Sequence, residues 1–350
     1  MDDRSGVPLE SETSQGALSF WAHTTDSRIF SFRYEGPPRR LHPYLLERYG
    51  PGRGAAWARE FYPARVRLEG APVSLGTVVT PGMRIAYRHQ RTEEPPPPPL
   101  TPPLYLDDWV LALEKPDCLP VNPVGVHYYT SLAVLGKERF GEPELTPLHR
   151  LDLETSGVVL FARKRRYLHT FHKLFHRHAV AKRYRALVYG QFPRDLDAIA
   201  GRIVPDDTTD IHTKLRLEPL PPDEWRPAER NQEGSSLTRI LSVTHHPTSH
   251  GVLSELALEP VTGKTNQIRV HLAHVGHPIV GDKKYHPDPA VFLDWAAHKD
   301  LARLDPRLLL TRQALHCESI ALRHPFTGEE LCIRSAPGAW AARIAPAVAG

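Results

Sequence analysis

The chain has 350 residues, of which 41% are hydrophobic and 24% charged, as is ordinary for a soluble globular protein of one or two domains. Its net charge of +4 is mild, and its three cysteines (Cys118, Cys317 and Cys332) lack CxxC spacing. This argues against a disulfide scaffold or a thiolate zinc site and fits a reducing cytoplasm. No apolar stretch approaches the roughly 18 residues of a membrane span, so we expect a cytoplasmic protein without a membrane partner.

The first third of the chain divides into three predicted segments. Residues 1–27 are polar, and we expect a flexible N-terminus. Residues 28–91 form a small unit with leucines at helical spacing within Arg39–Tyr49. Two short strands are expected in it, Ala64–Glu69 and Met83–Arg88. Residues 92–103 are rich in proline, which favours polyproline II and predicts a semi-rigid linker rather than a ligand for a proline-binding module.

From residue 104 to 345 the sequence predicts a second, larger domain. Strands recur without strict alternation with helices, which indicates an α+β fold with a largely antiparallel sheet. The predicted strands are Trp109–Leu113, Val158–Ala162, Tyr184–Tyr189, Arg239–Thr244, Leu253–Leu258 and Glu318–Arg323. The predicted helices are Ser131–Phe140, Tyr167–Arg177 and Asn266–Val275. Residues 217–234 are rich in Pro and Glu and predict an insertion loop.

A carboxylate stands close to an arginine at the turn before the predicted strand Val158–Ala162. Asp152 follows Arg150, and an aspartate at such a turn is in isolation usually a turn former. Its surroundings are unusual, because no acidic residue occurs from Thr155 to Arg194. The basic residues there are Arg163, Lys164, Arg165, Arg166, Lys173, Arg177, Lys182, Arg183 and Arg185. A carboxylate at the edge of so positive a stretch predicts chemistry on a polyanion.

Two later segments supply polar side chains of the kind that active sites use. The strand around residues 182–190 alternates and places Tyr184 on one face, although a strand tyrosine is most often half-buried packing. Thr265 or Asn266 can cap the next helix, and Arg269 lies near its start. A cation there gains nothing from the helix dipole, so Arg269 needs a carboxylate partner.

The histidines of the predicted helix 167–177 raise the question of a metal site. His169, His172 and His176 lie near one face, but no carboxylate or thiolate is close in sequence. Because Lys173 and Arg177 are interleaved with them, we favour a surface that faces phosphates and expect no metal. Glycine-rich nucleotide loops are absent, so no nucleotide cofactor is indicated.

Taken in order, these segments resemble the RluA family of RNA pseudouridine synthases over about residues 105–335. Residues 149–157 match the family's His-Arg-Leu-Asp-x-x-Thr-Ser-Gly signature around its catalytic aspartate. Residues 182–190 match Lys-x-Tyr-x-Ala-x-Val-x-Gly, and residues 263–272 match Gly-[Arg/Lys]-Thr-[His/Asn]-Gln-Ile-Arg-x-His-Leu. The chain departs from the family at Asn122, where histidine is usual, and at His286, where glycine is common.

The resemblance implies a pseudouridine synthase fold, with a largely antiparallel mixed sheet flanked by helices, and an isomerase that needs no cofactor. It implies Asp152 as the catalytic carboxylate, kept ionised by Arg269, since an adjacent cation favours the charged form. Tyr184 would stack on the target base, and Arg150 would fill the space that the extruded base leaves. Whether the carboxylate attacks the sugar, attacks the ring or removes a sugar proton is left open. The other residues expected to bind RNA are His149, Lys182, Arg163, Lys164, Arg165, Lys173 and Arg177.

The resemblance extends to the N-terminal unit and to the substrate. Residues 28–91 resemble a degenerate S-four-like RNA-binding domain, with a small structural cap as the alternative. Residues 120–131 resemble members that act on the tRNA anticodon stem-loop, so we rank tRNA ahead of large-subunit rRNA and expect a monomer. Two other functions compete, a histidine-ligated metalloenzyme and a non-catalytic RNA-binding factor. The latter would not require Asp152, Tyr184 and Arg269 to be present together.

Overall fold

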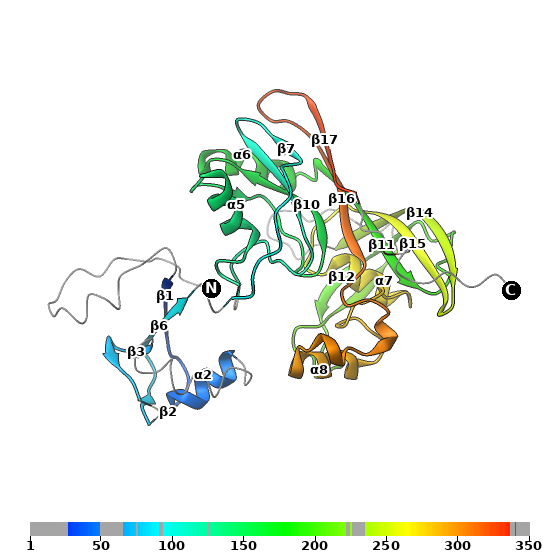
Figure 1. Cartoon of the computed structure of the whole chain (residues 1–350). Helices are drawn as coiled ribbons and strands as arrows, with labels where there is room; N and C mark the ends of the chain where they lie inside the picture. Colours follow the sequence, from blue (N-terminus) through cyan, green and yellow to red (C-terminus); the bar gives the residue numbers. More distant parts are fainter. Residues whose placement is uncertain are drawn as a thin grey trace. The chain divides into compact units, whose positions relative to one another are not determined.

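The computed structural model describes residues 27–49, 66–74, 76–90, 94–124, 127–221, 225, 235–336 and 340. These residues divide into two compact units (Figure 1). One comprises the described residues up to Pro95 together with 127–129, and the other comprises the rest. Of the segment predicted as a flexible N-terminus, residues 1–26 lie outside the described residues, and Ser27 begins a strand.

The smaller unit is a four-stranded sheet accompanied by one helix. Its sheet has the order β1 (Ser27–Arg33), β6 (Arg84–Gln90), β3 (Val66–Leu68), β4 (Ala71–Pro72), and all of these pairs are antiparallel. The helix α2 (Leu41–Tyr49) follows β2 (Arg39–Arg40), which pairs with β5 (Val78–Val79). Leu41, Leu45, Val66 and Ile85 are fully buried between helix and sheet. The predicted helix and both predicted strands are therefore present, although residues 64 and 65 of the first strand lie outside the described residues.

The larger unit is built on one eleven-stranded sheet with the order β13-β12-β14-β15-β11-β16-β10-β8-β7, to which β17 adds on β16 and β9 on β10. Its first strands are β7 (Tyr105–Leu106), β8 (Val110–Lys115), β9 (Thr146–Pro147), β10 (Ser156–Ala162) and β11 (Val180–Tyr189). The later ones are β12 (Ala198–Pro205), β13 (Leu215–Leu220), β14 (Ser236–Thr248), β15 (Gly251–Pro260), β16 (Leu315–Arg323) and β17 (Glu330–Arg334). Among the described strand pairs of this sheet, only β10 and β16 run parallel, which confirms the predicted mixed, largely antiparallel sheet.

Among the described residues, four α-helices accompany this sheet. They are α5 (Leu132–Phe140), α6 (Leu168–His176), α7 (Gln267–His274) and α8 (Pro289–His298), and a short 3₁₀ turn, η4 (Arg165–Tyr167), leads into α6. The first three were predicted, whereas α8 was not. The α7 helix packs against β12, β13 and β14 (Figure 1). None of the described helices is both long enough and apolar enough to cross a membrane.

The prediction of an insertion loop over residues 217–234 is wrong at the N-terminal end of this segment. Residues 215–220 form β13, which pairs along its whole length with β12. The proline at position 219 obscured this strand, but β13 is an edge strand, where a missing N–H is tolerated. Leu217 is buried and supplies the apolar contact that holds the edge. Of the remainder of the predicted loop, residues 222–224 and 226–234 lie outside the described residues.

One close backbone approach fixes the loop that precedes β10. Gly157 has φ +116°, and a Cβ at this position would collide with the backbone of Cys317 in β16. Only glycine satisfies both conditions. The parallel pairing of Ser156 and Gly157 with His316 and Cys317 therefore anchors the loop containing Asp152 on the middle of the sheet.

Candidate active site

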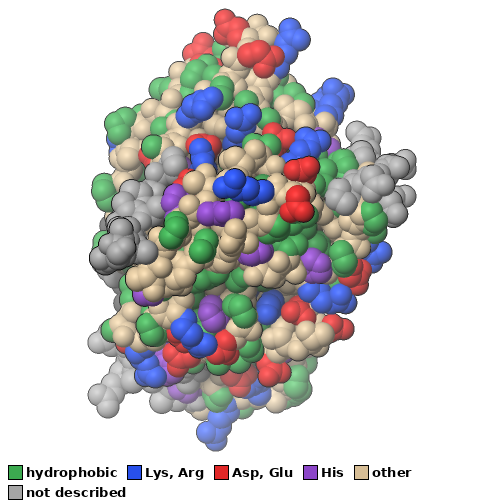
Figure 2. Space-filling view, turned by 90° about the vertical axis from the view of Figure 1, so that its right-hand side faces the viewer, with side chains coloured by type: hydrophobic (Ala, Val, Ile, Leu, Met, Phe, Trp, Pro, Cys, Tyr) green, Lys and Arg blue, Asp and Glu red, His purple; other side chains and the backbone are tan. Residues whose placement is uncertain are grey.

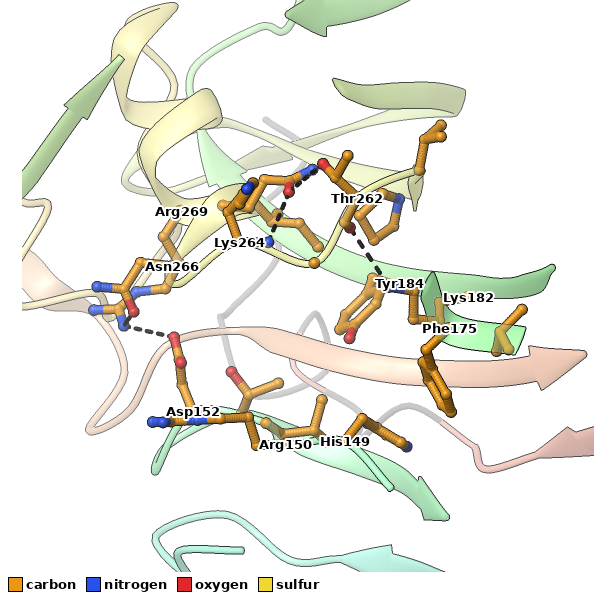
Figure 3. A pocket seen from close by; sticks show the side chains of 18 of the residues that line it. His149, Arg150, Asp152, Phe175, Lys182, Tyr184, Thr262, Lys264, Asn266 and Arg269 are labelled. Carbon is orange, nitrogen blue, oxygen red and sulfur yellow. Dashed lines mark hydrogen bonds and ion pairs between the residues drawn. The ribbon is translucent and has the colours of Figure 1, made fainter. Parts of the chain in front are cut away.

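A pocket of about 360 Å³ opens between the Asp152 loop, β11 and the start of α7 (Figure 3). This size lies within the range of small-molecule sites. Asp152, Tyr184 and Arg269 all line it, so the structure brings together three residues singled out from distant segments. Of the described residues that line the pocket, Asp152 is the only acidic one. The cationic lining residues are Arg150, Lys182, Lys264 and Arg269.

Asp152 and Arg269 form an ion pair in which Arg269 Nη1 lies 2.8 Å from Asp152 Oδ2 (Figure 3). The other side of the guanidinium binds Asp282 in a bidentate manner, with Nε 2.6 Å from Oδ2 and Nη2 2.9 Å from Oδ1. The Asp282 side chain is completely buried, whereas that of Asp152 is 23% exposed. Burial disfavours the charge on Arg269, but Asp282 and Asp152 outweigh this effect and raise its pKa. The guanidinium is thus a fixed cation with Asp152 as its exposed partner.

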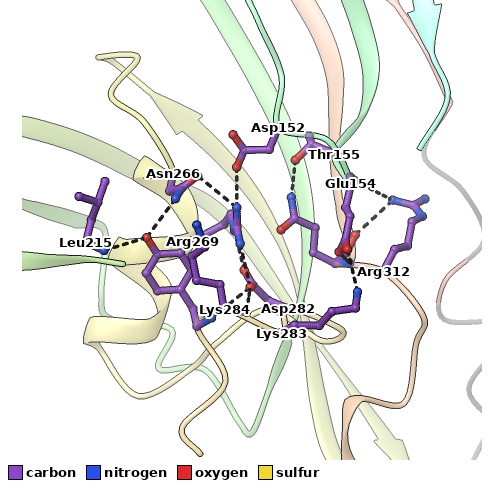
Figure 4. A network of polar contacts seen from close by, with 12 residues as sticks. Asp152, Glu154, Thr155, Leu215, Asn266, Arg269, Asp282, Lys283, Lys284 and Arg312 are labelled. Carbon is purple, nitrogen blue, oxygen red and sulfur yellow. Dashed lines mark hydrogen bonds and ion pairs between the residues drawn. The ribbon is translucent and has the colours of Figure 1, made fainter. Parts of the chain in front are cut away.

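Two residues that hold Arg269 were not identified from the sequence as site residues. Asp282 is the first of them, and the need of Arg269 for a carboxylate could have pointed to it. Asn266 is the N-cap of α7, as predicted, but its side chain accepts no hydrogen bond from a backbone N–H of the helix. Instead, its Oδ1 accepts from Arg269 Nη1 at 3.1 Å and its Nδ2 donates to the Tyr285 hydroxyl at 3.1 Å (Figure 4). The polar end of this residue therefore orients the arginine rather than capping the helix.

Tyr184 projects from β11 into the pocket (Figure 3) and is 9% exposed. Burial, together with the neighbouring Cys317 and Asp152, raises the pKa of its hydroxyl well above 10, so it is a neutral phenol. Lys182 lines the pocket two residues earlier on the same strand, with Nζ 3.5 Å from the Thr262 carbonyl oxygen. Burial lowers the pKa of Lys182. Tyr184 therefore presents a ring and a proton-bearing hydroxyl to whatever fills the pocket.

His149, predicted to bind RNA, is held by contacts within the protein. Its Nε2 accepts a hydrogen bond of 3.0 Å from the backbone N–H of Leu160, and its ring packs 5.5 Å from that of Phe175. Burial lowers the pKa of His149 to about 3, so the imidazole is neutral. His149 lines the pocket as a neutral side chain. Its neighbour Arg150 is exposed at the pocket.

The basic stretch around α6 is less positive than its sequence suggests. Arg163, predicted to bind RNA, donates from Nε to Glu142 Oε1 at 2.8 Å. Lys164 lies 4.0 Å from Glu144. Glu142 and Glu144 both precede residues 155–194, the segment that contains no acidic residue. On the face shown in Figure 2, Lys and Arg side chains are likewise interspersed with Asp and Glu rather than gathered in one field.

Three predicted RNA-binding residues of this stretch are exposed: Arg165, Lys173 and Arg177. None has an ion-pair partner in the part of the chain that the structure describes, and none lines the pocket. The α6 helix ends beside the pocket, because His176 belongs to its lining. Within the described residues, no group of three or more His, Cys, Asp or Glu side chains could hold a metal ion.

Comparison with protein families gives a match to the RNA pseudouridylate synthase family over residues 109–274. The dual-specificity RNA pseudouridine synthase RluA of Pasteurella multocida is 30% identical over 67% of this chain and 92% of its own length. The tRNA pseudouridine synthase C of Salmonella typhimurium is 32% identical over 66% of this chain and 84% of its own. The ribosomal large subunit pseudouridine synthase C of Buchnera aphidicola is 30% identical, and the match spans 65% of that protein.

Among solved structures, the human RNA pseudouridylate synthase domain containing 1 has a similar fold. It superimposes with a TM-score of 0.52 at 23% identity, covering 71% of this chain and 89% of its own. At this identity the likeness concerns the fold alone, and it agrees with a mixed sheet accompanied by few helices.

Proposed function

The chain belongs to the RluA family of RNA pseudouridine synthases, which are isomerases, and on this basis we propose that it converts specific uridines of RNA to pseudouridine with Asp152 as the catalytic carboxylate. One observation supports this assignment above all others. A single carboxylate stands in a pocket otherwise lined by cationic and neutral side chains, and it is bound at 2.8 Å by an arginine that is itself fixed.

The reaction sets what the pocket must do. The bond between ribose and a ring nitrogen breaks, the uracil turns, and a ring carbon takes the place of the nitrogen. There is no net oxidation and no group leaves the molecule. Attack on the sugar, attack on the ring and removal of a sugar proton all require an unprotonated carboxylate beside the nucleoside. Arg269, which Asp282 holds in place, keeps its guanidinium 2.8 Å from the Asp152 carboxylate.

The neighbouring side chains suit an extruded base. Leaving the stack costs a uridine a few kcal/mol, which contacts in the pocket must offset. The ring of Tyr184 offers a stacking surface, and its hydroxyl can form a hydrogen bond to the base. The exposed Arg150 can stack and form hydrogen bonds in the space that the base vacates.

For the substrate we propose tRNA ahead of large-subunit rRNA. The relatives named above comprise a dual-specificity RNA enzyme, a tRNA enzyme and a large-subunit rRNA enzyme. Arg165, Lys173 and Arg177 would contact phosphates along α6, a term that weakens as salt increases. We also propose that residues 28–91 assist RNA binding and that the protein acts as a cytoplasmic monomer. Its three cysteines are all free thiols, which supports a reducing compartment.

Mapping pseudouridine in total RNA from cells with and without the gene tests this proposal and identifies the target nucleoside. We expect at least one tRNA or rRNA position to lose its modification. A plasmid copy of the wild-type gene should restore it, and a copy encoding Asp152→Asn should not. Identical maps, together with purified protein that leaves the uridines of total RNA unchanged, would refute the proposed activity.

A further inference from the structure

A short turn after α7 contacts Arg269 and also the loop that carries Asp152. Asp282 binds Arg269, as described above, and the next residue, Lys283, points to the loop containing Asp152 (Figure 4). Lys283 Nζ lies 2.7 Å from Glu154 Oε1 and donates a second hydrogen bond of 2.7 Å to the Thr311 carbonyl oxygen. Its side chain is only 4% exposed. Two consecutive residues thus hold the two halves of the site.

Glu154 is in turn fixed from the opposite side. Its Oε2 accepts from the backbone N–H of Gln313 at 3.1 Å, and the Gln313 side chain donates to Thr155 Oγ1 at 2.6 Å. Arg312 Nη1 donates to the Glu154 carbonyl oxygen at 3.2 Å (Figure 4). Both carboxylate oxygens of Glu154 therefore have partners, on two segments that are distant in sequence.

The backbone of the turn is shaped for this contact. Gly281 has φ +79°, and a Cβ there would collide with the carbonyl group of Arg312. The turn can approach residues 311–313 so closely only with glycine at this position. Asp282 and Lys283 are therefore held in one geometry relative to the segment that also binds Glu154 and Thr155.

We propose that Lys283 and Glu154 are positioning residues, which set the distance and angle between Asp152 and Arg269 by tying the Asp152 loop to the turn that clamps the arginine. This inference rests on the proposed function. Neither residue lines the pocket, so each acts through Asp152 and Arg269 rather than on the RNA. Reactions of this kind depend steeply on geometry, and a displacement of about 1 Å can lower the rate by about 100-fold.

The test compares Lys283→Met and the double variant Glu154→Gln/Lys283→Met with the wild type. The double variant removes both charges and so avoids leaving one of them buried and unpaired. Arg185→Met is the matched control. Arg185 follows Tyr184 on β11 and lies outside the pocket lining. The Arg185→Met variant also loses ion pairs, because Arg185 lies 3.2 Å from Glu318 and 3.4 Å from Glu255.

Turnover number, Michaelis constant and RNA affinity are measured on the transcript that carries the mapped uridine, together with melting temperature. We expect both site variants to lose turnover by about 10- to 100-fold while RNA affinity changes less than threefold. Arg185→Met should lower the melting temperature and leave turnover unchanged. A wild-type turnover number in Lys283→Met would overturn the inference. So would recovery of turnover in the double variant, because the defect would then arise from an unpaired charge.

A crystal structure of each site variant keeps the inference separate from the proposed function. We expect the separation of Asp152 Oδ2 and Arg269 Nη1 to increase beyond hydrogen-bond range. An unchanged separation would refute the positioning role even if the wild type proved inactive on every RNA. Wild-type inactivity with a disrupted pair would instead refute the proposed function alone.

Discussion

Replacing Arg269 by alanine removes the cation on which two carboxylates depend. Asp282 would remain with a completely buried side chain and without its bidentate partner, and Asp152 would lose its ion pair. Asn266 would lose a hydrogen bond as well. We therefore expect Arg269→Ala to lower both stability and turnover.

The structure sets the size of the stability loss. Breaking a buried pair by removing one partner costs about 3–5 kcal/mol, because the other charge stays buried. In a domain of this size each kcal/mol shifts the melting temperature by about 2–4 °C. The expected decrease is therefore about 6–20 °C. Turnover should fall by about 100-fold or more, because Asp152 is no longer held in its orientation.

Thermal unfolding and single-turnover pseudouridine formation measure these two effects separately. The control is Arg269→Ala/Asp282→Asn, which removes the fully buried unpaired charge. It should recover part of the stability and none of the turnover. A wild-type melting temperature in Arg269→Ala would contradict the ion-pair argument, as would a double variant that is less stable than the single one.

Three other outcomes are expected. Asp152→Asn should abolish turnover while RNA binding stays within a few-fold of wild type; pseudouridine formation by pure variant protein would remove the catalytic assignment. Lys173→Ala should reduce the magnitude of the slope of log affinity against log salt concentration by about 0.7–0.9. Arg163→Ala should leave this slope unchanged, because Arg163 is paired with Glu142. Equal slopes for the two variants would contradict this expectation. Burial lowers the pKa of His271 to about 3, so between pH 6.5 and 3 the unfolded chain binds a proton that the folded chain does not. The free energy of unfolding therefore decreases as the pH is lowered through this range. His271→Gln should flatten this dependence, and exposed His169→Gln, measured in parallel, should not.

Most of the larger unit was predictable because its strands bury one or both faces and so show an apolar pattern. The edge strand β13 escaped prediction because its proline is compatible only with an edge position, which the sequence does not reveal. The α8 helix escaped because a proline at its first turn suggests a break, although proline is well suited to that position.

For the site, the sequence predicts which residues take part better than it predicts which side chains they contact. The need of Arg269 for a carboxylate followed from its place near a helix start, and the structure places Asp152 and Asp282 beside it. The partner of Arg163 could not be predicted, because Glu142 precedes it by 21 residues and approaches it only when β9 pairs with β10. Counting charges along a segment therefore overestimates the positive field of the folded surface.

Most of the segments that surround Asp152 are synthesised after it. Arg269 lies 117 residues further on, and the Gln313 that holds Thr155 lies 158 residues beyond that threonine. At roughly 5–20 residues per second, a ribosome exposes Asp152 at least about 6 s before Arg269. During that interval the carboxylate emerges among ribosomal RNA without its guanidinium partner or the later walls of its pocket. The ion pair of Asp152 and the contacts that hold its loop are therefore complete only after residue 313 has been synthesised.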